Sequence, residues 1–178
     1  IIFTPTPNVP QTTRTPTPAL PVDGPWLVYP APGDGGIHAY DLEAKQMLVI
    51  ELPQPVIFSD LTRGMSPDGK TLVLRAGSTD KIDELALYRI DLSSMDVSKI
   101  SPLMSITLQR KIVNNEGTRA FETFDAITRD DGIAWSPSGR FLAFTAALDN
   151  ESSDLYVYDQ LNDRVERLNG LYTCLLYT

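Results

Sequence analysis

The chain has 178 residues, 42% of them hydrophobic, and a formal net charge of -8. This charge argues against a nucleic-acid surface, because binding along phosphates needs clustered Lys and Arg. No stretch approaches the roughly 20 apolar residues of a membrane-spanning helix, and a single cysteine, Cys174, excludes an internal disulfide and a thiolate-rich metal site.

Residues 1–21 are rich in Thr and Pro, with the runs Thr4-Pro5-Thr6-Pro7 and Thr15-Pro16-Thr17-Pro18. Because Pro removes a hydrogen-bond donor and fixes φ, we expect a disordered, extended linker here. Such linkers often follow the export signal or lipid anchor of bacterial surface proteins, which predicts an extracytoplasmic location, in the periplasm or at the cell surface. A missing N-terminal anchor would then be the one membrane contact. A cytoplasmic interdomain linker would look similar.

The remainder predicts a repeated antiparallel β-meander, in which the same strands recur in a constant order. Second strands are expected at 26–29, 71–74 and 141–144, third strands at 37–41, 87–91 and 155–159, and fourth strands at 47–52, 97–100 and 165–168. First strands are visible only twice, at 61–66 and 133–136. Each third strand ends in Asp and continues into a polar turn.

Two of the second strands follow a related turn, Ser66-Pro67-Asp68-Gly69 and Ser136-Pro137-Ser138-Gly139. Pro presets φ in such a turn, and Gly accepts the positive φ that returns the chain antiparallel. The second strands are apolar almost without alternation, which suits a sheet covered on both faces. A four-stranded sheet of this kind is a β-propeller blade. A β-sandwich is the alternative, but its hairpins need not repeat one turn.

The spacing is irregular, because the two turns lie 70 residues apart and a blade usually takes about 40 to 50. The surplus lies at 102–131. We expect either an inserted hairpin around 115–118 that projects from the ring, or a lengthened fourth strand with a long crossover. A long loop in a compact domain is often functional.

The segments 66–74, 135–144 and 154–159 resemble the WD-like blade repeat of TolB-type β-propellers. The resemblance covers roughly residues 22–170 and implies an all-β fold with blades at about 22–56, 60–101 and 132–169. Propellers close with about four to eight blades, so three would form an incomplete ring. Since the chain lacks an initiator Met and residues 174–178 resemble a translated sequencing adapter, we expect a truncated fragment with a non-native tail at 171–178.

No catalytic motif is recognisable. The segment nearest to a Gly-x-Ser-x-Gly nucleophile elbow is Gly64-Met65-Ser66-Pro67-Asp68, which fails at the last position. His38 is the sole histidine and stands on a predicted strand without a partner motif. The acidic loops at 80–84 and 149–154 lack the Asp-x-Asp-x-Asp-Gly pattern of a Ca²⁺ loop. We therefore expect no enzyme activity, no cofactor and no metal.

These observations predict a non-enzymatic scaffold for protein–protein interaction, because rings of short strands expose loops at both ends. The candidate interaction residues are Asp80, Asp83, Glu84, Asn115, Glu116, Arg119, Asp149, Glu151 and Asp154. The protein partner is not identified, and no nucleic acid is expected. The resemblance leaves two alternatives, a propeller that gates a prolyl-oligopeptidase-type hydrolase and a surface propeller that binds glycans or metal.

An incomplete ring has a physical consequence. It leaves apolar sheet faces in water and unpaired strand edges at both ends. Units of a repeat fold depend on their neighbours for stability. We therefore expect the chain to self-associate or aggregate.

Overall fold

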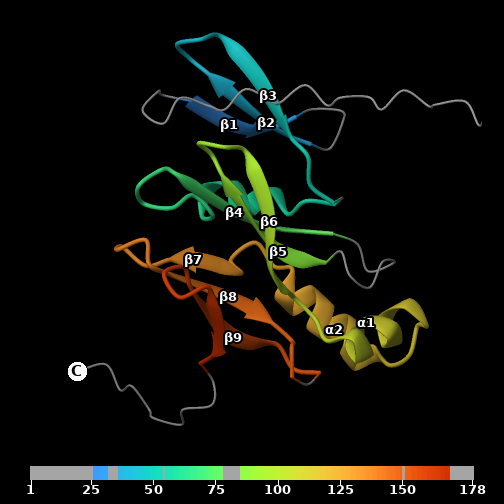
Figure 1. The fold of residues 1–178 in the computed structure, drawn as a ribbon. Helices are drawn as coiled ribbons and strands as arrows, with labels where there is room; N and C mark the ends of the chain where they lie inside the picture. Colours follow the sequence, from blue (N-terminus) through green and yellow to red (C-terminus); the bar gives the residue numbers. More distant parts are fainter. Residues whose placement is uncertain (1–25, 32–35, 54, 78–84, 150, 169–178) are drawn as a thin grey trace, which may run out of the picture.

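The computed structural model describes residues 26–31, 36–53, 55–77, 85–149 and 151–168, without the side chain of Trp26. These residues form three antiparallel sheets that lie one above another, with two helices beside the second and third sheets (Figure 1). The expected linker at 1–21 and tail at 171–178 lie outside the described residues. Within the described part, no helix is long and apolar enough to cross a membrane.

Each sheet is a meander of consecutive strands. The first contains β1 (Trp26–Pro30), β2 (Ile37–Asp41) and β3 (Gln46–Ile50), and the second contains β4 (Thr71–Ala76), β5 (Ala86–Asp91) and β6 (Asp96–Pro102). The third contains β7 (Ile133–Trp135), β8 (Phe141–Ala146), β9 (Asp154–Asp159) and β10 (Arg164–Arg167). The second, third and fourth strands of all three copies are confirmed, and the sheets have the meander order of propeller blades.

The two predicted turns close in the same way. The hydroxyl oxygens of Ser66 and Ser136 each accept a hydrogen bond at 3.0 Å from the backbone N–H five residues later. Gly69 and Gly139 adopt positive φ angles of 69° and 71°, which favour glycine. Both turns therefore direct the chain into the second strand in one frame.

A second shared turn follows every third strand. The carboxylates of Asp41 and Asp91 each accept two backbone N–H groups from the turn, and Asp159 accepts one. Four residues after each aspartate stands a non-glycine residue with φ between 47° and 60°, at positions Lys45, Met95 and Asp163. Since the turns coincide, residues of the three meanders can be matched position by position.

The apolar core lies between the sheets. One cluster joins the first and second sheets and includes Ile37 and Leu72, and the other joins the second and third sheets and includes Leu87 and Leu142. Every residue of β4 is buried, whereas residues of β8 alternate between buried and more exposed positions. The second sheet is therefore the one covered on both faces.

The expected first strand at 133–136 is confirmed as β7, whereas the one at 61–66 is wrong in its first half. A 3-10 helix, η1 (Phe58–Thr62), covers its first residues, and residues 64–66 pair with β4. The Asp60 carboxylate accepts the backbone N–H of Arg75 at 2.9 Å. Residues 55–57 pair with the end of β4 and residues 64–66 pair with its start. η1 therefore interrupts an edge segment that lies along β4, and the Asp60 carboxylate binds β4 where the backbone ladder is interrupted.

The insertion at 102–131 also differs from both expectations. It is a helical hairpin of α1 (Ile106–Val113) and α2 (Thr118–Ile127), and its turn lies close to the expected 115–118. The Ser105 hydroxyl caps α1 by accepting the Leu108 N–H at 3.2 Å. Leu108 and Ile127 pack into the core of the second and third sheets. The insertion is therefore held against the sheets, and its arms are helices because their apolar residues repeat at helical spacing.

Candidate interaction surface

The nine candidate residues fall into three groups. Asp80, Asp83 and Glu84 lie outside the described residues. Three others occupy the turn between the helices and the start of α2, namely Asn115, Glu116 and Arg119, and all three are exposed. The last three are Asp149 and Glu151, in the loop between β8 and β9, and Asp154, the first residue of β9.

The structure brings the loop between β8 and β9 against both helices. The Lys111 ammonium of α1 forms an ion pair with the Glu151 carboxylate, and both side chains are about one-third exposed. The Thr123 hydroxyl of α2 donates a hydrogen bond to the Glu151 backbone carbonyl. Two candidate regions that are distant in sequence are thus parts of one surface.

Two of the last three carboxylates have partners within the chain. Arg167 of β10 contacts Asp154 at 2.6 Å and Asp149 at 3.8 Å. The Tyr156 hydroxyl donates to Asp149 at 3.1 Å, and burial together with this acceptor raises the pKa of Tyr156. These contacts hold Asp149, at the start of the loop, close to β9 and β10.

Apolar side chains on the helices complete this surface. Ile106, Val113 and Phe121 are exposed although each is large and hydrophobic. Ile106 and Val113 are seven residues apart on α1, which places them on one side of the helix. We call these three residues, with the helix turn at 114–117 and Arg119, the helical-hairpin surface. Its apolar members were missed in the sequence because the segment was expected to contain strands.

A hollow of about 410 Å³ lies beside Ile106, between the end of β6, the start of α1 and Leu148. Gln109 lines it and is almost fully buried. The side-chain amide of Gln109 donates to the Met104 carbonyl at 3.2 Å, and among the described residues its own oxygen accepts no hydrogen bond. The hollow is lined by polar residues as well as apolar ones, namely Lys99, Ser101 and Ser105 beside Pro102, Met104, Ile106 and Leu148.

Both ends of the insertion are anchored to the sheets. At the start, the Ser105 N–H donates to the Ala147 carbonyl at 2.8 Å, and the Ala147 N–H donates to Leu103 at 2.8 Å. Met104 and Ala147 form a bridge between the second and third meanders. The insertion therefore contacts Ala147, the residue that follows β8, as soon as it leaves the second sheet.

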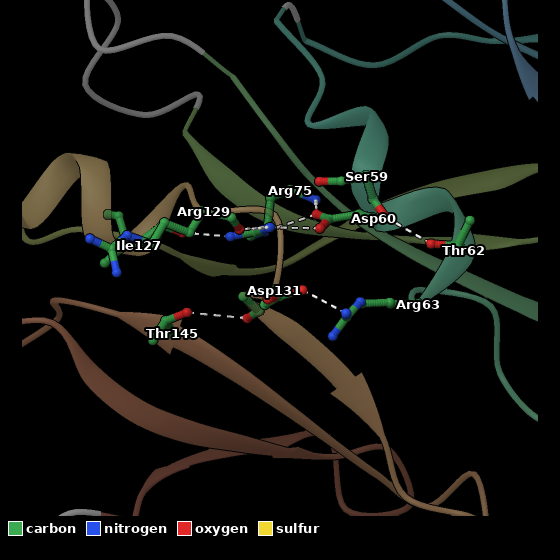
Figure 2. A network of polar contacts seen from close by, with 10 residues as sticks. Ser59, Asp60, Thr62, Arg63, Arg75, Ile127, Arg129, Asp131 and Thr145 are labelled. Carbon is green, nitrogen blue, oxygen red and sulfur yellow. Dashed lines mark hydrogen bonds and ion pairs between the residues drawn. The ribbon is translucent and has the colours of Figure 1, made fainter.

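At the other end, the fully buried Arg75 of β4 binds the chain that leaves α2 (Figure 2). Its guanidinium donates to the Asp60 carboxylate at 2.9 and 2.7 Å, and to the carbonyls of Ile127 and Arg129 at 2.6 and 2.7 Å. Burial raises the pKa of Asp60, and the hydrogen bonds from Arg75 oppose that rise. One side chain thus joins η1, β4 and the end of the insertion.

The backbone packs closely on this guanidinium. A Cβ added at Gly132 would lie 2.1 Å from Nη1 of Arg75, so this position has no room for a side chain. The Gly132 carbonyl accepts the backbone N–H of Thr145 at 3.0 Å. Nearby, Arg63 forms an ion pair with Asp131 at 2.5 Å on the surface (Figure 2). The helical-hairpin surface is therefore displayed on a rigid support.

Sequence reasoning missed the pairing of Asp60 with Arg75, although one signal was present. Arg75 is the single charged residue within the apolar run of β4. A charge at such a position is expected to have a buried partner. The identity of that partner depends on the bend of η1, which the sequence pattern did not predict.

No family model matches the chain, and no curated protein matches it. Among solved structures, it is similar to the crystal structure of TolB from Acinetobacter baumannii, with a TM-score of 0.45, 23% identity and coverage of 85% of this chain and 31% of that one. It is also similar to a TolB candidate from Agrobacterium tumefaciens, with a TM-score of 0.44, 15% identity and coverage of 80% and 41%. The chain thus spans less than half the length of either structure.

Proposed function

We propose that this chain is a non-enzymatic scaffold that binds a protein partner through the helical-hairpin surface. The observation that carries the proposal is that the insertion interrupts the repeat, is anchored at both ends, and still exposes Ile106, Val113 and Phe121. A segment that served only to connect two sheets would need neither the helices nor the exposed apolar residues.

The composition of the surface suits a protein partner. Interfaces combine an apolar centre with a polar rim, and a few large side chains dominate the binding free energy. Here the apolar residues are flanked by charges of both signs, among them Arg110, Glu116 and Arg119. The neighbouring hollow, which has both apolar and polar lining residues, provides a place for one anchoring side chain of the partner.

The rigid support also favours binding. Association is opposed by the ordering of loops and side chains at an interface. The Lys111–Glu151 ion pair and the bond from Thr123 already fix the loop against the helices. A partner would therefore meet a surface that needs little further ordering.

The absence of enzyme activity is part of this proposal. Among the carboxyl groups of the described residues, burial raises the pKa of Asp60. Catalytic carboxyl groups often have a raised pKa. Asp60 has no exposed surface, and Arg75 occupies both of its oxygens. Its position suits a structural ion pair better than contact with a substrate. An extracytoplasmic location is likewise proposed, supported by the Thr/Pro-rich segment at 1–21.

The test is affinity capture from bacterial envelope extract, with crosslinking, using the full chain and two matched variants. Val113→Glu places a charge in the helical-hairpin surface, and Leu161→Glu makes the same kind of change at an exposed apolar position in the turn after β9. We expect a protein retained by the wild type and by Leu161→Glu but lost with Val113→Glu. Circular dichroism should confirm that both variants are folded. Equal recovery with all three would contradict the proposal.

A further inference from the structure

The outer faces of the first and third sheets are the two ends of the stack (Figure 1). We call the outer face of the first sheet the leading face; it carries Leu27, Tyr29 and Tyr40. We call the outer face of the third sheet the trailing face; it carries Ala143, Leu155 and Val157. Because strand residues alternate between faces, these residues point away from the neighbouring sheet.

The shared repeat frame identifies what the leading face corresponds to. Leu27 occupies the position of Leu72 in the second meander and Leu142 in the third. Both of these leucines are 0% exposed, and each belongs to the core formed with the preceding sheet. Leu27 is 54% exposed. The leading face is therefore the counterpart of a surface that is covered wherever a preceding sheet is present.

The trailing face gives the same result in the other direction. Leu155 occupies the position of Ile37 in the first meander and Leu87 in the second. Ile37 and Leu87 are 0% exposed, and each belongs to the core formed with the following sheet. Leu155 is 41% exposed. The trailing face thus corresponds to a surface that a following sheet covers.

Aromatic rings are frequent at leading positions, at Tyr29 and Tyr40 on the leading face and at Phe144, Tyr156 and Tyr158 within the stack. Trailing positions hold aliphatic residues at Val28, Ala39, Ala143 and Val157, and larger ones at Arg89 and Phe141. On the trailing face, Arg164 and Glu166 of β10 form an ion pair, and a hollow of about 150 Å³ lies between them, Phe141 and Val157. Both internal interfaces place a trailing surface on a leading one.

We propose that two copies of this chain bind head to tail, with the trailing face of one copy on the leading face of the other. This contact continues the two interfaces that already exist within the chain, and each copy carries both surfaces that it requires. Two copies would bring six sheets together, which lies within the roughly four to eight sheets of closed propellers. When both ends of each copy are covered, the assembly closes as a dimer and does not extend into a filament.

Sedimentation velocity of the full chain over a concentration series tests the proposal. The wild type should reach twice the 19.7 kDa of the single chain. Leu27→Glu and Leu155→Glu should each weaken association at least about tenfold, because each replaces an apolar side chain of the proposed contact by a charge. Leu42→Glu and Leu161→Glu make the same change at exposed leucines in the turns of the same two sheets, and should keep the dimer.

A mixture of the two interface variants tests the head-to-tail arrangement. In a mixed dimer, one interface joins the intact trailing face of Leu27→Glu to the intact leading face of Leu155→Glu. The mixture should therefore associate more tightly than either variant alone. Circular dichroism of each variant establishes that it is folded.

Three results would overturn the proposal. A wild type that stays monomeric throughout the series would exclude the dimer. Sensitivity to Leu27→Glu without sensitivity to Leu155→Glu would indicate contact between two leading faces. Aggregates that neither variant reduces would show that self-association does not use these surfaces.

Discussion

The second and third sheets have similar second strands but differ in burial. Residues 71–76 of β4 and 141–146 of β8 are both largely apolar without strict alternation. All of β4 is buried, whereas β8 presents Phe141 to solvent and buries Leu142 and Phe144. The difference arises from neighbours, because the second sheet lies between two others. The position of a residue in the repeat thus determines the sheet face on which it lies. The position of the sheet in the stack determines whether a neighbouring sheet covers that face.

The largest change in stability should come from Arg75→Met. Arg75 is a charged residue on a face of the second sheet that the third sheet covers, so it tests the effect of burial directly. The change leaves the Asp60 carboxylate and two carbonyls without their buried donor. We expect the free energy of unfolding to fall by about 3 to 5 kcal/mol. Urea denaturation measures the loss.

The control for Arg75→Met is the double variant Asp60→Leu with Arg75→Met. It removes both charges and should recover part of the stability, since replacing a buried ion pair by apolar residues is often close to neutral. If Arg75→Met alone lowered the free energy of unfolding by less than about 1 kcal/mol, Arg75 would be hydrated and would not connect the sheets through buried hydrogen bonds.

Matched leucines test the comparison itself. Leu72→Ala removes a fully buried side chain between the first and second sheets and should lower the free energy of unfolding by about 2 to 5 kcal/mol. Leu27→Ala removes the equivalent residue of the leading face and should change it by less than about 0.5 kcal/mol in dilute, monomeric protein. Chemical denaturation of both variants gives the two values. Equal losses would contradict the assigned frame.

The regular part of this architecture was predictable because its signals are local. The Ser-Pro turns and the aspartates that end the third strands determine hairpin geometry within a few residues. All ten strands of the described residues were expected at nearly their observed positions. Two predictions failed where a segment departs from the repeat, at η1 and at the helical hairpin.

The helices could have been predicted, whereas the ion pair could not. Leu108 and Ile112 are four residues apart, and Ala120, Thr123 and Ile127 follow helical spacing, so a 3.6-residue period was present in the sequence. The pairing of Asp60 with Arg75 depends on the bend of η1, and the same guanidinium also binds the carbonyls of Ile127 and Arg129, more than 50 residues away in the chain. Only the assembled sheets bring these groups together.

The helical hairpin offers a smaller effect. Ser105→Ala removes the hydroxyl that caps α1 and should lower the free energy of unfolding by about 1 kcal/mol. Ser105→Thr keeps an acceptor at the same place and should recover most of that loss. Thermal denaturation followed by circular dichroism compares the variants. An alanine variant as stable as the wild type would show that the start of α1 does not depend on this cap.

The smallest effect concerns acid stability in the turns after the third strands. A hydrogen bond from Arg140, and further donors in the turn, lower the pKa of Asp159; the Ser93 hydroxyl lowers that of Asp91. A carboxyl group with a lowered folded-state pKa stabilises the fold above its unfolded pKa of 3.8, and this contribution disappears as pH falls through the folded pKa.

Asp159→Asn should therefore reduce the loss of stability between neutral pH and about pH 2. Urea denaturation at several pH values gives this dependence. Asp96→Asn changes an exposed carboxylate of the second meander and serves as the control. A variant with the same pH dependence as the wild type would show that Asp159 does not contribute to it.

The central claim is that three separate sheets are stacked, with the trailing surface of one packed on the leading surface of the next. Methyl-labelled NMR tests it directly. We predict nuclear Overhauser contacts that link Ile37 and Ile50 to the leucines of β4, and a separate set that links Val73 and Leu87 to Leu142. Backbone contacts of paired strands between β3 and β4, or between β6 and β7, would instead show one continuous sheet and contradict the account.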